Sequence, residues 1–511
     1  MLSPVNVHVN VNVPDSPSLS LSPSPSATPW PRIESLALSH FGVRALRPGQ
    51  RELIDAVLAG RDALGILPTG GGKSLTYQLP ALVLPRPVVV ISPLIALMKD
   101  QCDHMDDADV DAAELDSTLT ATEERDCERE IRAGAHPLVY VTPERFRTEE
   151  CQAMLRARGI SLIAVDEAHC VSSWGHDFRP AYMAIARGAE ALGRPPILAL
   201  TATATSETAA DIVKQLGMRA PRMVRTSLVR PNLSFEVERT VNEMAKRSAL
   251  LRLFDDEAGA GIVYTATVKK ADELYRWIGA LRVPVARYHG RMSAAEREES
   301  RAHFMSGRVR VMVATKAFGM GIDKADTRFV THYEFPDSLE SYVQEAGRAG
   351  RDGKPARCVL LYRLEDQRVQ RFFLATRAPG RGDVEKVVAA AGCFEDFSST
   401  STSTTSTSTS TSTSRTRESA VEAIARGTGV GRRRVEGIVA HWQRLVDASG
   451  DGAGGGVRDV VDALVSEYDA RRLRDEARLR AMMRYAEGVG DRAVAIAEYF
   501  GEIAANTARR R

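Results

Sequence analysis

Short runs of apolar and β-branched residues recur along the first part of the chain and alternate with segments that repeat with helical spacing. Runs without a polar face are typical of strands buried on both sides, as in a parallel sheet covered by helices. The runs of this first set lie at residues 63–67, 87–91, 138–141, 162–165 and 197–200. The pattern predicts an α/β domain over residues 32–225.

A second set of strand-like runs follows after a break near residues 225–245. It comprises residues 261–264, 285–288, 309–313 and 357–362. Because the alternation of short strands and helices returns, we expect a second α/β domain over residues 226–375. The predicted fold class is therefore α/β, with two parallel-sheet domains in tandem.

The segments outside these domains differ in composition. Residues 1–31 are rich in Ser, Pro, Val and Asn and are expected to be disordered, because they cannot bury a core. Residues 376–417 include a nearly pure Ser/Thr run and predict a solvated linker. Apolar residues then recur at helical spacing over residues 418–450 and 457–511, so the C-terminal region is predicted to be mostly helical.

Three consecutive arginines begin the second helix expected within residues 418–450; they are Arg432, Arg433 and Arg434. In a helix-turn-helix, arginines at this position would meet DNA phosphates. A solvated basic helix start explains the same residues equally well. Both interpretations stay open.

Overall composition changes this picture little. The 511 residues carry 68 Lys and Arg against 66 Asp and Glu, and the net charge of +2 neither requires nor excludes a nucleic-acid partner. None of the six cysteines stands in a C-x-x-C pair, which argues against a disulfide framework and a cysteine-based metal site. We find no membrane-spanning apolar run and no secretory or transit pattern, and expect a cytoplasmic protein without a membrane partner.

A glycine-rich stretch, here called the phosphate loop (residues 67–74), follows the first predicted strand and precedes a predicted helix. Its glycines let backbone N–H groups close on phosphate oxygens, and the helix N-terminus adds a favourable dipole. The residues expected to cradle ATP are Thr69, Gly70, Gly71, Gly72, Lys73 and Ser74. Lys73 would meet the β- and γ-phosphates, and Ser74 would ligate Mg²⁺. The strict spacing of such loops places a glycine where this chain has Leu67, so the loop is a variant.

Two adjacent carboxylates, Asp166 and Glu167, follow the predicted strand at residues 162–165 and are called the acidic pair. Ligands of parallel α/β sheets bind at the carboxyl ends of strands, so the acidic pair is expected to reach the same phosphates as Lys73. Asp166 suits a Mg²⁺ contact, and Glu167 suits orientation of the attacking water. Without the phosphate loop, such a pair would indicate only a solvated surface.

A basic stretch of the second domain, here called the arginine segment (residues 344–351), supplies the third part of the predicted site. It contains Gln344, Arg348 and Arg351 among small residues. Planar guanidinium donors match phosphate oxygens and stabilise charge that develops on the γ-phosphate. Because the segment lies in the other domain, hydrolysis is expected to require closure of both domains on ATP. Taken alone, the segment is also compatible with a basic surface loop.

Together these segments resemble superfamily 2 helicases with a DEAH motif and, among them, the RecQ family. The likeness runs over residues 36–373, about two-thirds of the chain. Residues 41–50 resemble the adenine-reading motif of that family, which implies that Gln50 bonds the adenine edge with help from Arg47. Where the family often has an aromatic ring that stacks on adenine, this chain has Val43, so the stacking partner is not assigned.

Other parts of the likeness concern the nucleic acid. Residues 169–180 resemble the aromatic-rich loop of RecQ proteins, and Trp174, Phe178 and Arg179 in it suit base stacking and cation–π contact with DNA. Motifs that track the strand or link it to hydrolysis are matched at residues 92–101, 141–145 and 201–203. Residues 314–315 and 318–323 match late motifs of the family.

The resemblance implies two RecA-like domains that use ATP and Mg²⁺, move 3′ to 5′ on single-stranded DNA, and open forked or structured DNA in recombination and repair. If the protein is bacterial, the resemblance implies association with the nucleoid. The resemblance does not identify a protein partner. An RNA helicase, a translocase that does not unwind, and a non-enzymatic DNA-binding scaffold are the alternatives.

The C-terminal region departs from the family pattern. RecQ proteins typically carry a helical zinc-binding domain with four clustered cysteines, and this chain has no such cluster. Residues 482–487 and 498–502 nevertheless resemble a helix and the Phe-Gly-Glu segment of that domain, and residues 489–492 stand where the first cysteine is expected. Zinc is therefore not expected; either the metal has been dispensed with or the domain is truncated.

Overall fold

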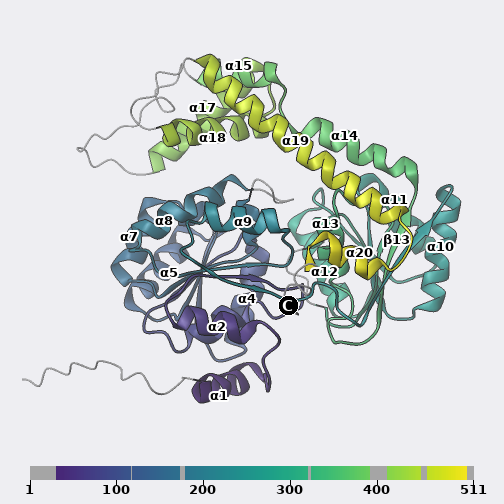
Figure 1. The fold of residues 1–511 in the computed structure, drawn as a ribbon, viewed down its shortest axis with the longest axis horizontal. Coiled ribbons are helices and arrows are strands. Elements are labelled where there is room, and N and C mark those ends of the chain that lie inside the picture. The colour runs from purple at the N-terminus through teal and green to yellow at the C-terminus, as the bar shows by residue number, and fades with distance from the viewer. Residues whose placement is uncertain are drawn as a thin grey trace, which may run out of the picture.

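The computed structural model describes residues 30–116, 118–172, 179–319, 324–391, 411–449 and 457–502. Within them the chain folds into two α/β domains, with a layer of helices lying across both (Figure 1). The predicted fold class is thus confirmed. Nearly all of the segment predicted to be disordered, residues 1–31, lies outside the described residues, and the first described element, α1, begins at Trp30.

The first domain is built on a seven-stranded parallel sheet in the order β3-β4-β2-β5-β6-β1-β7. Its strands are β1 (Ala63–Ile66), β2 (Val88–Ile91), β3 (Ala112–Leu115), β4 (Leu138–Val141), β5 (Leu162–Val165), β6 (Ile197–Thr201) and β7 (Arg222–Arg225). The edge strands β3 and β7 were not predicted, because they carry exposed or half-buried polar residues instead of an apolar run.

Helices of the first domain precede the sheet or connect its strands. They are α1 (Trp30–Phe41), α2 (Gln50–Leu58), α3 (Leu75–Ala81), α4 (Ile95–Asp106), α5 (Ala121–Ala133), α6 (Pro143–Phe146), α7 (Glu149–Arg158), α8 (Ile185–Ala191) and α9 (Ser206–Gln215). Two short 3₁₀ turns, η1 (Ala168–Val171) and η2 (Pro180–Ala184), follow β5. This alternation leaves the carboxyl ends of β1 and β5 free to build a ligand site.

The second domain contains a six-stranded parallel sheet in the order β10-β11-β9-β12-β13-β8. Its strands are β8 (Leu233–Arg239), β9 (Ala260–Tyr264), β10 (Val285–Tyr288), β11 (Val311–Ala314), β12 (Thr327–His332) and β13 (Ala356–Tyr362). The accompanying helices are α10 (Glu243–Asp256), α11 (Val268–Ala280), α12 (Ala294–Met305), α13 (Leu339–Ala346) and, after the 3₁₀ turn η3 (Leu364–Asp366), α14 (Gln367–Arg377). The unpredicted strands β8 and β12 alternate or mix polar and apolar residues.

The C-terminal helices are α15 (Arg381–Ala391), α17 (Thr411–Thr428), α18 (Arg432–Ser449), α19 (Val457–Glu487) and α20 (Arg492–Tyr499). The first three pack with the N-terminal half of α19 around an apolar core of their own. The C-terminal half of α19 instead enters the core of the α/β domains through Met482 and Tyr485. In Figure 1, α19 runs from the cluster above α8 and α9 to the second domain.

Part of the predicted linker, residues 376–417, is helical. Helix α15 lies inside it, and α17 begins at Thr411. The predicted linker extended well before the Ser/Thr run at residues 398–414 and so included α15, in which Val384, Val387, Val388 and Ala391 recur at helical spacing and are buried. Residues 392–410 of this prediction lie outside the described residues.

The arginines at the start of α18 face carboxylates. Arg432 pairs with Glu422 and Glu436, and Arg434 pairs with Asp383. These ion pairs favour a structural role for the two side chains over contact with phosphates. The helix-turn-helix function stays a prediction.

Three further features of the described part of the chain bear on the sequence analysis. No helix there is long and apolar enough to cross a membrane. No group of three or more His, Cys, Asp or Glu side chains there is arranged to hold a metal ion. The five cysteines within those ranges are free thiols.

Candidate functional site

A cavity of about 500 Å³ lies between the two α/β domains. The first domain lines it with the phosphate loop and the acidic pair, and the second with the arginine segment. The predicted residues that meet there are Thr69, Gly70, Gly72, Lys73, Ser74, Asp166, Glu167, Gln344, Arg348 and Arg351. The structure therefore brings the three predicted parts of the site into one cleft.

The phosphate loop turns sharply between β1 and α3 because two of its glycines adopt angles that other residues avoid. Gly70 has φ +76° and Gly72 has φ +75°. The Nζ of Lys73 lies 3.5 Å from the carbonyl oxygen of Leu67, so the ammonium folds back over the loop. Leu67 is accommodated in place of glycine because its N–H donates to Thr201 in the neighbouring strand and its side chain is buried in the core.

The acidic pair sits directly after β5, where burial makes its charged form costly. Asp166 is 8% exposed and Glu167 is 9% exposed. Burial, followed by the Glu167 carboxylate, raises the pKa of Asp166 to about 6, although Lys73 acts in the opposite direction. A cation would offset this cost, and hydroxyl and carboxylate oxygens are ligands that Mg²⁺ prefers. The oxygens of Ser74 and Asp166, which line the same cleft, therefore fit a Mg²⁺ ion.

Glu167 connects the acidic pair to residues 201–203. Its backbone has φ +45°, an uncommon conformation for a non-glycine residue and a form of strain that functional sites often store. Its Oε2 lies 3.3 Å from Nδ1 of His169, and that nitrogen lies 3.0 Å from Oγ1 of Thr201. The Thr201 hydroxyl donates to the carbonyl of Thr203 at 3.1 Å. A continuous chain of polar contacts therefore runs from the cleft to the segment that was predicted to link hydrolysis to DNA.

The arginine segment touches the phosphate loop across the cleft. A Cβ built on Gly70 would lie 3.4 Å from Cγ of Arg351, and one built on Gly347 would lie 3.0 Å from Cβ of Thr69. Arg348 also lines the cleft, but it is only 5% exposed. Of these two arginines, Arg351 is the one that lies against the phosphate loop.

The two residues predicted to read adenine lie beside the phosphate loop. Gln50 is buried; its Oε1 accepts the backbone N–H of Arg47 at 2.7 Å, and its Nε2 donates to the carbonyl of Gly72 at 2.8 Å. The Arg47 guanidinium donates to the carbonyl of Gly70. Val43 packs against the apolar cluster between α1, α2 and α3. A cavity of about 760 Å³ opens next to Arg47, and none of the described residues that line it is aromatic.

The residues predicted to contact DNA are described only in part. Trp174 and Phe178 lie outside the described residues, so their role stays a prediction. Arg179 is described, and its Nη1 donates to the carbonyl of Pro93 at 2.9 Å. Pro93 belongs to residues 92–101, the first segment expected to track the strand. Arg179 thus joins two predicted DNA-contacting segments.

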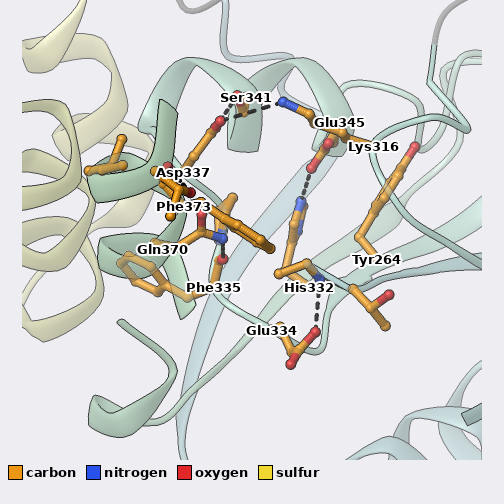
Figure 2. A pocket seen from close by; sticks show the side chains of 15 residues that line it. Tyr264, Lys316, His332, Glu334, Phe335, Asp337, Ser341, Glu345, Gln370 and Phe373 are labelled. Atoms are coloured by element: carbon orange, nitrogen blue, oxygen red, sulfur yellow. Dashed lines mark hydrogen bonds and ion pairs between the residues drawn. The ribbon is translucent and has the colours of Figure 1, made fainter. Parts of the chain in front are cut away.

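A further cavity, here called the β9–β12 cavity, has a volume of about 390 Å³ and lies in the second domain with α13 and α14 as walls (Figure 2). The aromatic rings of Phe335 and Phe373 line it. The Nε2 of His332 lies 2.7 Å from the Glu345 carboxylate. Glu334 accepts a backbone N–H at 2.9 Å, and burial raises its pKa. Neither Glu334 nor Phe373 was singled out from the sequence.

Comparison with known proteins identifies relatives of both domains. The family model for DEAD/DEAH box helicases matches residues 47–212, and that for the helicase conserved C-terminal domain matches residues 245–353. ATP-dependent DNA helicase RecQ of Bacillus subtilis (strain 168) is 45% identical over 349 residues, which are 67% of this chain and 58% of that protein. Probable ATP-dependent DNA helicase RecS of the same organism is 38% identical over 346 residues, 66% of this chain and 69% of that protein.

Among solved structures, the helicase Lhr of Mycobacterium smegmatis bound to ssDNA and AMP-PNP shares the fold. It aligns with a TM-score of 0.55 and 20% identity, over 81% of this chain and 58% of that one. The chain spans between 51% and 58% of the length of three RecQ relatives that it matches.

Proposed function

The chain belongs to the RecQ family of ATP-dependent DNA helicases, and from this premise we propose that it couples ATP hydrolysis between its two α/β domains to movement along DNA. The observation that carries the proposal is the position of Arg351, which lines the cleft together with the phosphate loop and comes within 3.4 Å of a Cβ built on Gly70. A triphosphate bound there would touch both domains, so its cleavage would remove contacts that hold them together.

In the proposed site the first domain binds ATP and activates water. Lys73 binds the β- and γ-phosphates. Ser74 and Asp166 would hold Mg²⁺, which would neutralise phosphate charge. Glu167 orients the attacking water and accepts its proton. Through its contact with His169, a change at Glu167 during hydrolysis is transmitted to residues 201–203.

The second domain completes the proposed site with the arginine segment. Arg351 stabilises the charge on the transferred phosphoryl group, with Gln344 and Arg348 beside it in the cleft. Gln50 and Arg47 read adenine; both now donate to carbonyls of the phosphate loop, so base binding would exchange those bonds for bonds to the nucleotide. Nucleotide binding would thereby reorganise the loop that holds the phosphates.

The proposed DNA track crosses both domains, from the β9–β12 cavity to residues 169–180. A volume of about 390 Å³ and the rings of Phe335 and Phe373 suit an unstacked base. Movement from 3′ to 5′, action on single-stranded and forked DNA, and a role in recombination and repair are proposed from the family alone.

The β9–β12 cavity yields a test of this track. We expect Phe373→Ala to weaken binding of single-stranded DNA about tenfold, because stacking on an aromatic ring is worth ~1–3 kcal/mol per base. The rate of ATP turnover in the absence of DNA should not change, because Phe373 lines the β9–β12 cavity and does not line the nucleotide cleft. The measurement is fluorescence anisotropy of a labelled oligonucleotide.

The matched control is Phe372→Ala. The Phe372 ring is 64% exposed and does not line the cavity, whereas that of Phe373 is 40% exposed and does. Equal losses in the two variants would place the bound base elsewhere.

Strand displacement tests the proposed function as a whole. We expect the protein to release the labelled strand of a 3′-tailed duplex only when ATP and Mg²⁺ are present, and not that of a 5′-tailed duplex. The same tail made of RNA should stimulate ATP turnover less than DNA does. Turnover of ATP without displacement on either tail would indicate a translocase instead of a helicase.

A further inference from the structure

The connector between the two α/β domains, residues 226–232, sends one side chain into the arginine segment. The guanidinium of Arg230 donates to the carbonyls of Gly347 at 2.9 Å and Gly350 at 3.2 Å, and also to that of Ala349. Carbonyls in a loop have no partner in regular structure and need another donor. A guanidinium offers several donors in one rigid plane, so a single side chain shapes the whole turn.

Arg230 also lies beside the nucleotide cleft. A Cβ built on Gly70 would lie 3.6 Å from Nη1 of Arg230 and 3.4 Å from Cγ of Arg351. Burial lowers the pKa of Arg230, and the nearby charges of Arg351 and Arg47 lower it further. Asn232 braces the far end of the same turn by donating to two carbonyls at 2.8 Å each. The connector therefore holds the arginine segment where it meets the phosphate loop.

The connector is itself anchored by the C-terminal segment (residues 500–502), the Phe-Gly-Glu stretch noted in the sequence. Arg225, the last residue of β7, donates to the carbonyl of Phe500 at 2.6 Å. The backbone N–H of Leu228 donates to Glu502 at 2.7 Å, and Glu502 also accepts a serine hydroxyl of the connector at 3.0 Å. The Phe500 side chain is buried in the core shared with both α/β domains. The C-terminal segment thus holds the first half of the connector in place through hydrogen bonds.

We propose that Arg230 is a positioning residue for ATP hydrolysis, which shapes the turn that carries Arg348 and Arg351, and that the C-terminal segment fixes the connector from which Arg230 projects. The inference rests on the proposed ATPase function. Arg230 is not a catalytic residue, because its donors are directed at backbone carbonyls. The C-terminal region then contributes to hydrolysis through the connector, without touching the nucleotide.

The first test replaces the guanidinium. We expect Arg230→Gln to lower kcat of DNA-stimulated ATP turnover about 100-fold, because a displacement of about 1 Å in a catalytic group costs that much. The KM for ATP and the affinity for ADP should stay within about threefold, because a group that acts only in the transition state leaves ground-state binding unchanged. Trapping of ADP with aluminium fluoride, which mimics the transition state, should be lost. Arg230→Lys should recover part of both losses.

The ATP turnover of the wild-type protein tests the proposed function. The Arg230 variants test the present inference, and they do so only if the wild-type protein hydrolyses ATP. Arg282→Gln is the control, because Arg282 is exposed in the second domain and remote from the connector in sequence. A kcat within about twofold of wild type for Arg230→Gln would overturn the proposal. So would a fall in ADP affinity and melting temperature parallel to the fall in kcat, because it would show a merely structural role.

The second test addresses the C-terminal segment. We expect Glu502→Gln to lower kcat about threefold to tenfold at unchanged KM. The substitution weakens the hydrogen bond from the Leu228 N–H and leaves the buried Phe500 side chain in place. The matched control is Glu498→Gln, an exposed residue of α20. In the double variant with Arg230→Gln, the loss should equal that of Arg230→Gln alone, since both act on one turn. Losses that multiply would show that the C-terminal segment does not act through Arg230.

Discussion

Replacement of Lys73 by alanine is expected to abolish DNA-stimulated ATP turnover and strand displacement together. The ammonium follows the turn at Gly72 and lines the cleft opposite the arginine segment. Removal of one such charged donor from a closed site costs about 100- to 1000-fold in kcat, or ~3–4 kcal/mol of the barrier. The fold should survive, because the Lys73 side chain donates one long bond, 3.5 Å, to the carbonyl of Leu67, and alanine keeps the backbone bonds.

The measurement is steady-state phosphate release with saturating oligonucleotide, accompanied by a thermal melt. Lys214→Ala, an exposed lysine on α9, is the matched control and should behave as wild type. If Lys73→Ala retained more than about a tenth of the wild-type rate, the phosphate loop would have to be given up as the ATP site.

Replacement of Arg351 by alanine is expected to separate ATP binding from cleavage. The residue belongs to the second domain yet lies against the phosphate loop, with its Cγ 3.4 Å from a Cβ built on Gly70, so it acts only when the cleft is closed. An arginine that stabilises phosphoryl-transfer charge is worth about 1000-fold or more in kcat. The affinity for ADP should change little, because Lys73 and the glycines of the phosphate loop remain in place.

Single-turnover hydrolysis and equilibrium binding of a fluorescent ADP analogue measure the two effects separately. Lys354→Ala provides the control, because Lys354 is exposed just beyond the arginine segment and does not line the cleft. A loss of affinity as large as the loss of kcat would mean that Arg351 binds nucleotide in the ground state instead of assisting its cleavage.

The sequence predicted the buried strands well and the edge strands poorly, for a physical reason. Strands such as β2 and β5 lie inside the sheet with every residue buried, so they appear as uninterrupted apolar runs. Strand β7 carries two exposed residues at the edge, and β12 contains buried Thr331 and His332, so neither shows a run. Strands are recognisable from sequence when their burial matches their apolar composition.

The candidate site was predictable where a chemical motif marked it. The phosphate loop, the acidic pair and the arginine segment met in one cleft as expected. Glu334 was missed because β12 was not recognised, so nothing indicated a carboxylate at the end of a strand. Arg230 was missed because its role depends on three carbonyls more than a hundred positions away in the chain, at Gly347, Ala349 and Gly350. Contacts between residues so far apart in the chain are visible only once the fold is known.

The C-terminal segment illustrates the same limit. Its Phe-Gly-Glu sequence was recognisable, but the resemblance linked it to a helical zinc-binding domain and not to the connector. In the structure Phe500 and Glu502 bond the connector between the α/β domains. Those bonds give the segment a structural role next to the connector.

The central claim is that the nucleotide bound in the cleft, which contacts both domains, determines the affinity of the protein for DNA. The most direct measurement is the affinity of wild-type and Arg351→Ala protein for a 3′-tailed oligonucleotide, with ADP and with ADP–beryllium fluoride. We predict a change of at least about tenfold between the two nucleotides for the wild type, and less than about twofold for the variant. Equal wild-type affinities with both nucleotides would contradict the claim.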